Sequence, residues 1–196
     1  LRALSTPDKI GVSYLEHDLT WRDLYNQAYS LSLSLQKANI CKGDVVGIYI
    51  PHSLGQIVAL FAVAMRDAIF TIINPHLVPD QVKHQIQDAS AKAVIGSEEL
   101  LSPMKEFFSN RQMHVETIEA TGYSGGDITL VRDLNTCVTT NIPADVSNYI
   151  YTSGSTGLPK GVIETHADVM HFTRVWSNAY HVCPDDRVTL LATLGF

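Results

Sequence analysis

Residues 152–161 bring together the kinds of side chain that hold an anion. The segment reads Thr-Ser-Gly-Ser-Thr-Gly-Leu-Pro-Lys-Gly, with four hydroxyls, three glycines and one lysine but no acidic residue. Glycines let backbone N–H groups approach an oxyanion closely, hydroxyls donate further hydrogen bonds, and a lysine adds positive charge. The composition therefore predicts a local cradle for a polyphosphate.

The spacing within this segment excludes two common nucleotide-binding loops. A Walker A loop carries lysine directly after its second glycine, whereas Lys160 stands three residues beyond Gly157 and precedes Gly161. A dinucleotide-binding G-x-G-x-x-G is not satisfied either. A flexible Ser/Gly linker is the alternative. The strand-like residues 149–151 before the segment and the apolar residues 162–163 after it favour an ordered site.

Because the chain is negatively charged overall, an anion must be bound by a local group of donors and not by a basic surface. Lys and Arg number 14 against 20 Asp and Glu, giving a net charge of −6, which argues against general affinity for nucleic acid or anionic lipid. The 196 residues are 45% hydrophobic and 17% charged, so a buried core is feasible.

The cysteines and the apolar runs indicate where in the cell the protein is expected. Cys41, Cys137 and Cys183 form neither a C-x-x-C pair nor an even set, which favours a reducing compartment, and we expect the cytoplasm. We expect no membrane span, because no apolar run reaches the roughly 18 residues that a spanning helix needs. We also expect no signal peptide, because no basic stretch followed by an apolar run opens the chain.

Strand-like and helical segments alternate along the chain with short connections. Strands are expected at residues 45–50, 69–73, 93–95, 115–118, 149–151 and 188–191, and helices at 21–38, 54–65, 79–88, 98–108 and 165–178. This alternation predicts a three-layer α/β fold in which a mostly parallel sheet is flanked by helices. Thr20 with Asp23, and Thr165 with Asp168, have the spacing of capping boxes and predict where two helices begin.

Residues 121–147 differ in amino-acid composition from the rest of the chain. Glycine, asparagine and proline punctuate this region, and within it residues 128–131 alone resemble a strand. We therefore expect a long internal loop there.

A resemblance to a known family rests on residues 151–162, which read YTSGSTGLPKGV. This run resembles the signature of the adenylate-forming superfamily, which includes acyl-CoA synthetases, luciferases and the amino-acid adenylation domains of nonribosomal peptide synthetases. Further stretches similar to the family are LTWRDL at 19–24, KGDVVGI at 42–48, INP at 73–75 and DASAK at 88–92. The chain departs from the family pattern at residues 67–70 and at 147–148, and neither departure removes a residue of the signature.

The resemblance implies which part of a larger domain the chain forms and which residues contact ATP. It places residues 1–196 in the N-terminal part of the large AMP-binding domain of an adenylate-forming enzyme, with the C-terminal domain absent and the rest of a longer chain as a partner. It implies that the signature binds the β- and γ-phosphates of ATP, with Lys160 as the catalytic residue. The implied contacts are Thr152, Ser153, Gly154, Ser155, Thr156, Gly157 and Lys160.

The resemblance also implies a reaction. A carboxylic acid joins AMP as an acyl-adenylate with release of pyrophosphate, Mg²⁺ offsets the phosphate charge, and the acyl group passes to a thiol. The Ser155 form of the signature and residues 178–191 favour an amino acid as substrate and the phosphopantetheine of a carrier protein as acceptor. An acyl-CoA ligase for fatty or aryl acids, with CoA as acceptor, is the second reading. A non-catalytic nucleotide-binding module is a third, and the 196 residues alone are expected to be inactive.

The remaining polar residues predict no metal site. His166 and His171 are five positions apart on one expected helix, which does not place them on a common face as a metal pair requires. His52, His76 and His84 are scattered without a carboxylate or cysteine partner in register. Cys183 lies in an expected turn, and nothing in its neighbourhood indicates a nucleophile.

Overall fold

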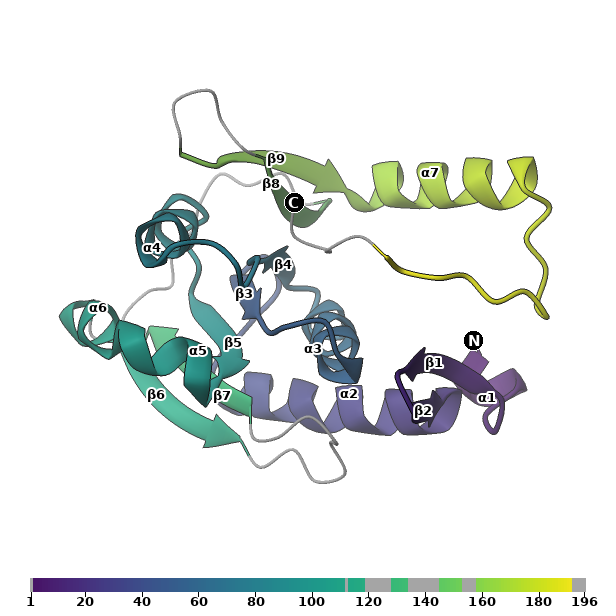
Figure 1. The fold of residues 1–196 in the computed structure, drawn as a ribbon, viewed down its shortest axis with the longest axis horizontal. Helices are drawn as coiled ribbons and strands as arrows, with labels where there is room; N and C mark the ends of the chain where they lie inside the picture. The colour runs from purple at the N-terminus through teal and green to yellow at the C-terminus, as the bar shows by residue number, and fades with distance from the viewer. Residues whose placement is uncertain (1, 112, 119–127, 134–144, 153–157, 192–196) are drawn as a thin grey trace.

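The computed structural model describes residues 2–111, 113–118, 128–133, 145–152 and 158–191 (Figure 1). Its strands are β1 (Ile10–Tyr14), β2 (His17–Thr20), β3 (Val45–Tyr49), β4 (Ile69–Ile72), β5 (Ala93–Ser97), β6 (Met113–Ile118), β7 (Ile128–Asp133), β8 (Val146–Thr152) and β9 (Lys160–Thr165). Its helices are α1 (Arg2–Ser5), α2 (Trp21–Lys37), α3 (Leu54–Ala64), α4 (Pro79–Asp88), α5 (Glu98–Leu101), the 3₁₀ helix η1 (Ser102–Met104), α6 (Lys105–Asn110) and α7 (His166–Ala179).

Within these described ranges, seven strands form one sheet in the order β6-β7-β5-β3-β4-β8-β9. The four central strands, β5, β3, β4 and β8, are parallel to one another. The outer strands are antiparallel to their neighbours, β7 and β6 at one side and β9 at the other. The expectation of a mostly parallel sheet flanked by helices is confirmed for the central part of the sheet, and the antiparallel edges are a refinement.

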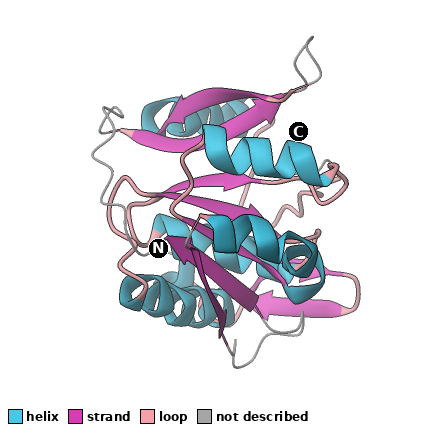
Figure 2. Cartoon of the chain, turned by 90° about the vertical axis from the view of Figure 1, so that its left-hand side faces the viewer, coloured by secondary structure: helices cyan, strands magenta, loops and turns pink. Residues whose placement is uncertain are grey.

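Helices cover both faces of the sheet and bury a core on each (Figure 2). The first core joins α2 and α3 to alternate strand residues such as Val46 and Ile48. The second joins α4, α5 and α6 to the residues between them, such as Val45 and Tyr49. Successive strand residues point to opposite faces, so one strand supplies both cores. The three-layer architecture predicted from the sequence is therefore confirmed.

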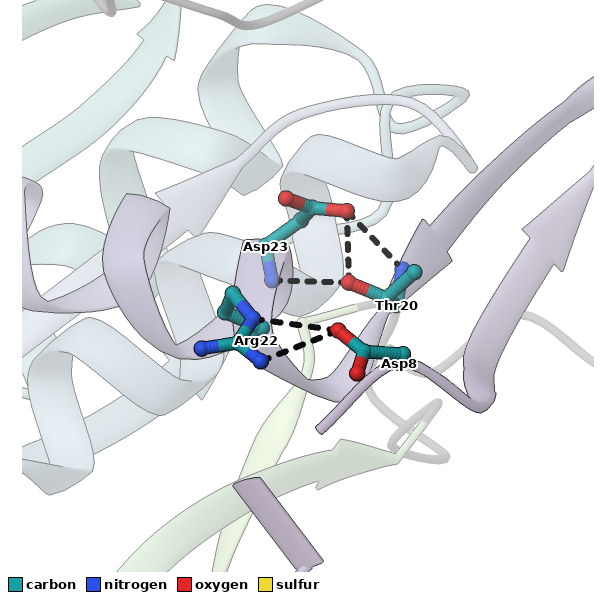
Figure 3. A network of polar contacts seen from close by, with 4 residues as sticks. All are labelled: Asp8, Thr20, Arg22 and Asp23. Atoms are coloured by element: carbon teal, nitrogen blue, oxygen red, sulfur yellow. Dashed lines mark hydrogen bonds and ion pairs between the residues drawn. The ribbon is translucent and has the colours of Figure 1, made fainter. Parts of the chain in front are cut away.

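The two predicted capping boxes are both present. At the start of α2, the Thr20 hydroxyl accepts from the Asp23 backbone N–H at 3.1 Å, and Asp23 accepts from the Thr20 backbone N–H (Figure 3). Beside it, the Arg22 guanidinium donates to Asp8 at 3.0 Å and ties the preceding turn to the helix. Thr165 and Asp168 form the same box at the start of α7. These contacts satisfy N–H groups that a helix start leaves without partners.

Two of the expected elements are wrong. Residues 98–108 do not form one helix, because α5 ends at Leu101 and η1 precedes α6. Pro103 explains the interruption, since proline has no N–H to donate to the preceding turn. Residues 188–191 are not a strand, and Val188 and Leu191 are exposed. The short β1–β2 hairpin was not expected.

The region 121–147, expected to be a long loop, is described only in part. Residues 128–133 form β7, which pairs with β5 and β6, so the strand-like pattern noted at 128–131 corresponds to a strand of the sheet. Residues 145–147 belong to the start of β8 and the turn before it. Residues 121–127 and 134–144 lie outside the described residues, and the expectation for them stays a prediction.

The fold thus contains two regions with different packing. We call strands β3, β4, β5 and β8 with helices α2 to α6 the sheet body, and we call β9, α7 and residues 180–191 the C-terminal arm. Helix α7 follows directly from the end of β9, and none of its residues is buried against any described part of the chain (Figure 1). The exposed apolar residues of the arm are Val162, Ile163, Val169, Met170, Phe172, Val175, Trp176, Tyr180, Val182, Val188, Leu190 and Leu191.

Candidate active site

The anion-binding segment predicted from the sequence connects β8 to β9. These strands form an antiparallel pair in which Tyr151 lies opposite Gly161 and Thr152 lies opposite Lys160. Strand β8 is also parallel to β4, with Thr71 opposite Tyr149. The segment therefore begins at the carboxyl end of a central parallel strand, the edge of a sheet at which α/β proteins bind their ligands.

Two of the predicted site residues lie within the described chain, and the pairing brings them together. Thr152 and Lys160 are directly opposite each other, so their side chains share one face of the hairpin, and both residues are exposed. A residue with a hydroxyl and a residue with an ammonium group are therefore cross-strand neighbours where the segment leaves and rejoins the sheet. Ser153, Gly154, Ser155, Thr156 and Gly157 lie outside the described residues, and their roles stay predictions.

The opposite face of the hairpin is packed through Tyr151 and Gly161. A Cβ atom at Gly161 would lie 3.1 Å from Cζ of the Tyr151 ring, so the absence of a side chain gives the ring room to lie across β9. The Tyr151 hydroxyl donates to Oδ2 of Asp88 on α4 at 2.7 Å. Burial, reinforced by the Asp88 carboxylate, raises the pKa of the Tyr151 phenol well above its ordinary value, so this proton stays in place.

A second contact from α4 reaches the far end of the segment. Nε2 of His84 lies 3.2 Å from the carbonyl oxygen of Pro159, a buried residue that directly precedes Lys160. A carbonyl oxygen only accepts hydrogen bonds, so Nε2 is the protonated ring nitrogen. The sequence analysis expected neither this contact nor the one between Tyr151 and Asp88. The spacing of His84 and Asp88, one helical turn apart, indicates a shared helix face but does not mark either partner.

Comparisons with known proteins assign the chain to a family. A family model described as AMP-binding enzyme matches residues 2–196. The chain belongs to the AMP-binding enzyme family. The resemblance to adenylate-forming enzymes seen in the signature and in the upstream stretches is thereby confirmed.

Curated relatives of the chain are much longer proteins. It is 27% identical to bacitracin synthase 2 of Bacillus licheniformis over 195 residues, which cover 100% of this chain and 7% of that protein. It is 24% identical to tyrocidine synthase 1 of Brevibacillus parabrevis, with 100% of this chain and 17% of that protein covered. It is 25% identical to zwittermicin A synthase ZmaJ of Bacillus cereus, with 95% and 34% covered. The chain spans about a third or less of the length of these relatives.

Solved structures share the fold of the chain. O-succinylbenzoate coenzyme A synthetase from Bacillus subtilis, in complex with ATP and magnesium, matches with a TM-score of 0.71 and 19% identity, over 94% of this chain and 47% of that one. The anthranilate CoA ligase AuaEII, in complex with anthranoyl-AMP, matches with a TM-score of 0.69 and 19% identity, over 90% and 35%. At these identities the likeness shows a common fold.

The structure also places three other residues that the sequence analysis considered. His166 and His171 are exposed on α7. Cys183 opens a turn in which its backbone N–H donates to Asp186 at 2.7 Å, and its thiol is free and exposed. Among the described residues, no three His, Cys, Asp or Glu side chains are grouped closely enough to hold a metal ion, and no helix is long and apolar enough to cross a membrane.

Proposed function

We propose that the protein containing this chain activates a carboxylic acid with ATP. The carboxylate oxygen attacks the α-phosphorus, the bond to the β-phosphate oxygen breaks, and pyrophosphate leaves with that electron pair. The product is an acyl-adenylate. The acyl carbon then accepts a thiolate, and AMP leaves. Membership of the AMP-binding enzyme family supports this reading, and the long signature at the end of β8 carries it.

The described residues fit the phosphate end of ATP. Thr152 offers a hydroxyl donor and Lys160 a positive charge on the same face of the hairpin. Hydrogen bonds that involve a charged group are shorter and stronger than neutral ones, so Lys160 is the largest single contributor that we assign. Ser153, Gly154, Ser155, Thr156 and Gly157 are proposed to add hydroxyl and backbone donors around the β- and γ-phosphates.

Catalysis in this proposal rests on position and charge. The leaving pyrophosphate gains negative charge as its bond to the α-phosphorus breaks, and fixed donors stabilise that charge without having to reorganise. Mg²⁺ bound to the phosphate oxygens would offset more of this charge. The chain itself supplies no cluster of carboxylates for the ion within the described residues, so the phosphates and residues elsewhere in the protein are its expected ligands.

The acyl acceptor is proposed to be the phosphopantetheine thiol of a carrier protein, with an amino acid as substrate. The Ser155 form of the signature supports this choice, as do relatives named as synthases of bacitracin, tyrocidine and zwittermicin A. CoA as acceptor for a fatty or aryl acid is the alternative. The same adenylation step serves both outcomes, so the acceptor requires its own experiment.

Exchange of labelled pyrophosphate into ATP tests the adenylation step. The full-length protein is incubated with ATP, Mg²⁺, labelled pyrophosphate and, one at a time, amino acids, aryl acids and fatty acids. We expect exchange with a narrow set of amino acids. A correctly folded protein that exchanges with no acid in the panel would contradict the proposal and favour a non-catalytic nucleotide-binding module.

Variants of the hairpin test the assignment of the site. Lys160→Ala should lower kcat/KM for exchange by roughly tenfold or more, because hydrogen bonds to charged groups contribute about 1.5–3 kcal/mol. Thr152→Ala should have a smaller effect in the same direction. Lys37→Ala, at the exposed end of α2, is the matched control that removes a lysine away from the hairpin. Equal losses in Lys160→Ala and Lys37→Ala would exclude a local role for Lys160.

The acceptor is tested by offering both thiols to the preformed acyl-adenylate. The full-length protein is given its cognate acid with ATP and then either CoA or a phosphopantetheinylated carrier protein. Mass spectrometry identifies the thioester. We expect the carrier-bound product, and accumulation of acyl-CoA alone would instead establish the ligase reading.

A further inference from the structure

Helix α4 is firmly attached to the sheet beside the signature hairpin. Val82 and Ile86 on its inner face are fully buried in the core that also contains Tyr151. The amide of Gln85, 1% exposed, donates to the Thr71 hydroxyl at 3.0 Å and to the Ile72 carbonyl at 3.2 Å. Strand β4, which carries both acceptors, is the parallel neighbour of β8. The helix therefore has a fixed position relative to the strand from which the signature begins.

From this fixed position, α4 contacts both ends of the signature hairpin. Asp88 accepts from the hydroxyl of Tyr151, which directly precedes Thr152. His84 donates to the carbonyl of Pro159, which directly precedes Lys160. Residues four apart on a helix lie on the same face, so one face of α4 makes both contacts.

We propose that His84 and Asp88 are positioning residues for the proposed ATP site, which they hold through Pro159 and Tyr151. We call the pair of contacts the α4 clamp. Neither residue touches the nucleotide in this proposal. The clamp holds the Tyr151 side chain and the Pro159 backbone carbonyl, one residue before each of the two described donors, and so constrains where Thr152 and Lys160 stand. The proposal rests on the function proposed above for the hairpin.

The physical argument concerns small displacements. Donors that stabilise developing charge must be held close to their productive geometry, and a misplacement of about 1 Å can reduce rate on the order of 100-fold. Strand β9 lies at the edge of the sheet, and its residues Val162 and Ile163 are exposed, so packing alone constrains its start weakly. A hydrogen bond to the buried Pro159 carbonyl supplies the missing constraint at that point.

The direction of the His84 hydrogen bond gives the proposal a spectroscopic signature. Nε2 carries a proton both in the neutral Nε2–H tautomer and in the imidazolium, so the contact to Pro159 is retained in either state. The neutral ring must adopt the Nε2–H tautomer as long as the contact exists. Ring nitrogen chemical shifts report this tautomer directly, without any need for catalysis.

The kinetic test uses paired variants in the full-length protein. His84→Leu removes the donor, whereas His84→Gln places an amide N–H at a similar reach, and Gln87→Leu on the exposed side of α4 is the control. We expect His84→Leu to lower kcat/KM for ATP in pyrophosphate exchange about tenfold or more, mainly through kcat. His84→Gln should recover most of the loss, and Gln87→Leu should match the wild type. If His84 only stabilised the fold, glutamine would not restore activity, and the loss in His84→Leu would not be confined to kcat.

A parallel pair tests the other contact of the clamp. Asp88→Asn keeps an oxygen that accepts from Tyr151, whereas Asp88→Ala does not. Asp88→Ala should lower kcat/KM in the same manner as His84→Leu, and Asp88→Asn should lower it much less. Full activity in both His84→Leu and Asp88→Ala, with the fold intact by circular dichroism, would overturn the proposal.

Nuclear magnetic resonance separates failure of the clamp from failure of the proposed function. In the wild type, His84 should show the Nε2–H tautomer, and His84→Leu should shift the backbone amide signal of Lys160 and speed its hydrogen exchange. These outcomes support the clamp even in a protein that exchanges no pyrophosphate, a result that would overturn the proposed adenylation alone. An Nδ1–H tautomer at His84, or an unmoved Lys160 amide in His84→Leu, would overturn the clamp whatever the activity.

Discussion

The sheet body and the C-terminal arm differ in how far their apolar side chains are buried. In the body, helices cover both faces of the sheet, and residues such as Leu35 and Ile48 are fully buried. In the arm, α7 buries none of its residues against the described chain, and Phe172 is 64% exposed. The proposed ATP site lies at the boundary, because β8 belongs to the body and β9 to the arm. Stability thus draws on the body, whereas the proposed chemistry draws on the strand pair that joins the body to the arm.

The arm shows an amphipathic pattern without the partner that such a pattern normally implies. An apolar stripe on a helix is usually buried against a core. The solved structures that share the fold are about twice as long or more, since the match covers 47% and 35% of two of them. Within the described residues, nothing covers the apolar side of α7.

The largest contrast is expected between core and arm truncations. Leu35→Ala, at a fully buried position of α2, should lower the free energy of unfolding by about 2–5 kcal/mol. Phe172→Ala on α7 should change it by no more than about 0.5 kcal/mol. Equilibrium urea unfolding of residues 1–196 measures both. Similar losses at the two positions would mean that the arm is packed in solution, and the comparison would fail.

A second contrast uses two glycines. A Cβ at Gly96 in the body would lie 2.9 Å from the backbone oxygen of Tyr49, which cannot move independently of the sheet. Gly96→Ala should therefore destabilise by about 1–3 kcal/mol. At Gly161 in the arm, the neighbour is the Tyr151 ring, which can tilt, so Gly161→Ala should cost less stability but weaken the contact to Asp88. Unfolding midpoints give the first effect, and the Tyr151 ring signals in proton spectra give the second.

A third prediction concerns alkaline pH at the boundary. Because the folded state raises the pKa of Tyr151, the folded protein keeps a proton that the unfolded chain loses above about pH 10. Stability from this group is therefore complete below pH 10 and falls as the pH rises, by up to about 1.4 kcal/mol per pH unit. Tyr151→Phe should make the alkaline decline in unfolding free energy shallower. A slope equal to that of the wild type would show that Tyr151 ionises freely in the folded state.

The smallest effect is expected where the arm touches the N-terminal part of the chain. Lys9 donates to Asp185 at 3.1 Å, and their side chains are 58% and 84% exposed. Exposed ion pairs contribute about 1 kcal/mol or less, so Asp185→Asn should leave the unfolding midpoint nearly unchanged and insensitive to added salt. A loss as large as that of Leu35→Ala would show that this contact anchors the arm.

The sequence was informative where the decisive interactions are local. The capping boxes at Thr20 and Thr165 depend on residues three apart, and the structure contains both. The alternation of strands and helices led to the correct layers. Pro103 is a local signal for the break between α5 and α6, and the prediction of one helix over residues 98–108 did not use it.

The features that escaped prediction depend on tertiary contacts. The apolar residues 188–191 resemble a strand, yet the described chain offers them no neighbouring strand with which to pair. His84 looked isolated because its partner is a backbone carbonyl, which no sequence pattern marks. The signature predicted the residues of the proposed ATP site, whereas the helix that holds its two ends became visible in the structure.

The α4 clamp also has a consequence for the order of folding. Its two contacts join residues that are 63 and 75 positions apart in the chain. Closing such long loops costs chain entropy before the contacts offset it, so distant pairings form more slowly than local ones. We expect β8 and β9 to dock late, after β3, β4 and α4 have assembled. A nascent chain would then hold a compact sheet before the proposed nucleotide site is complete, and the docking of β8 and β9 on α4 would be the slow step of refolding.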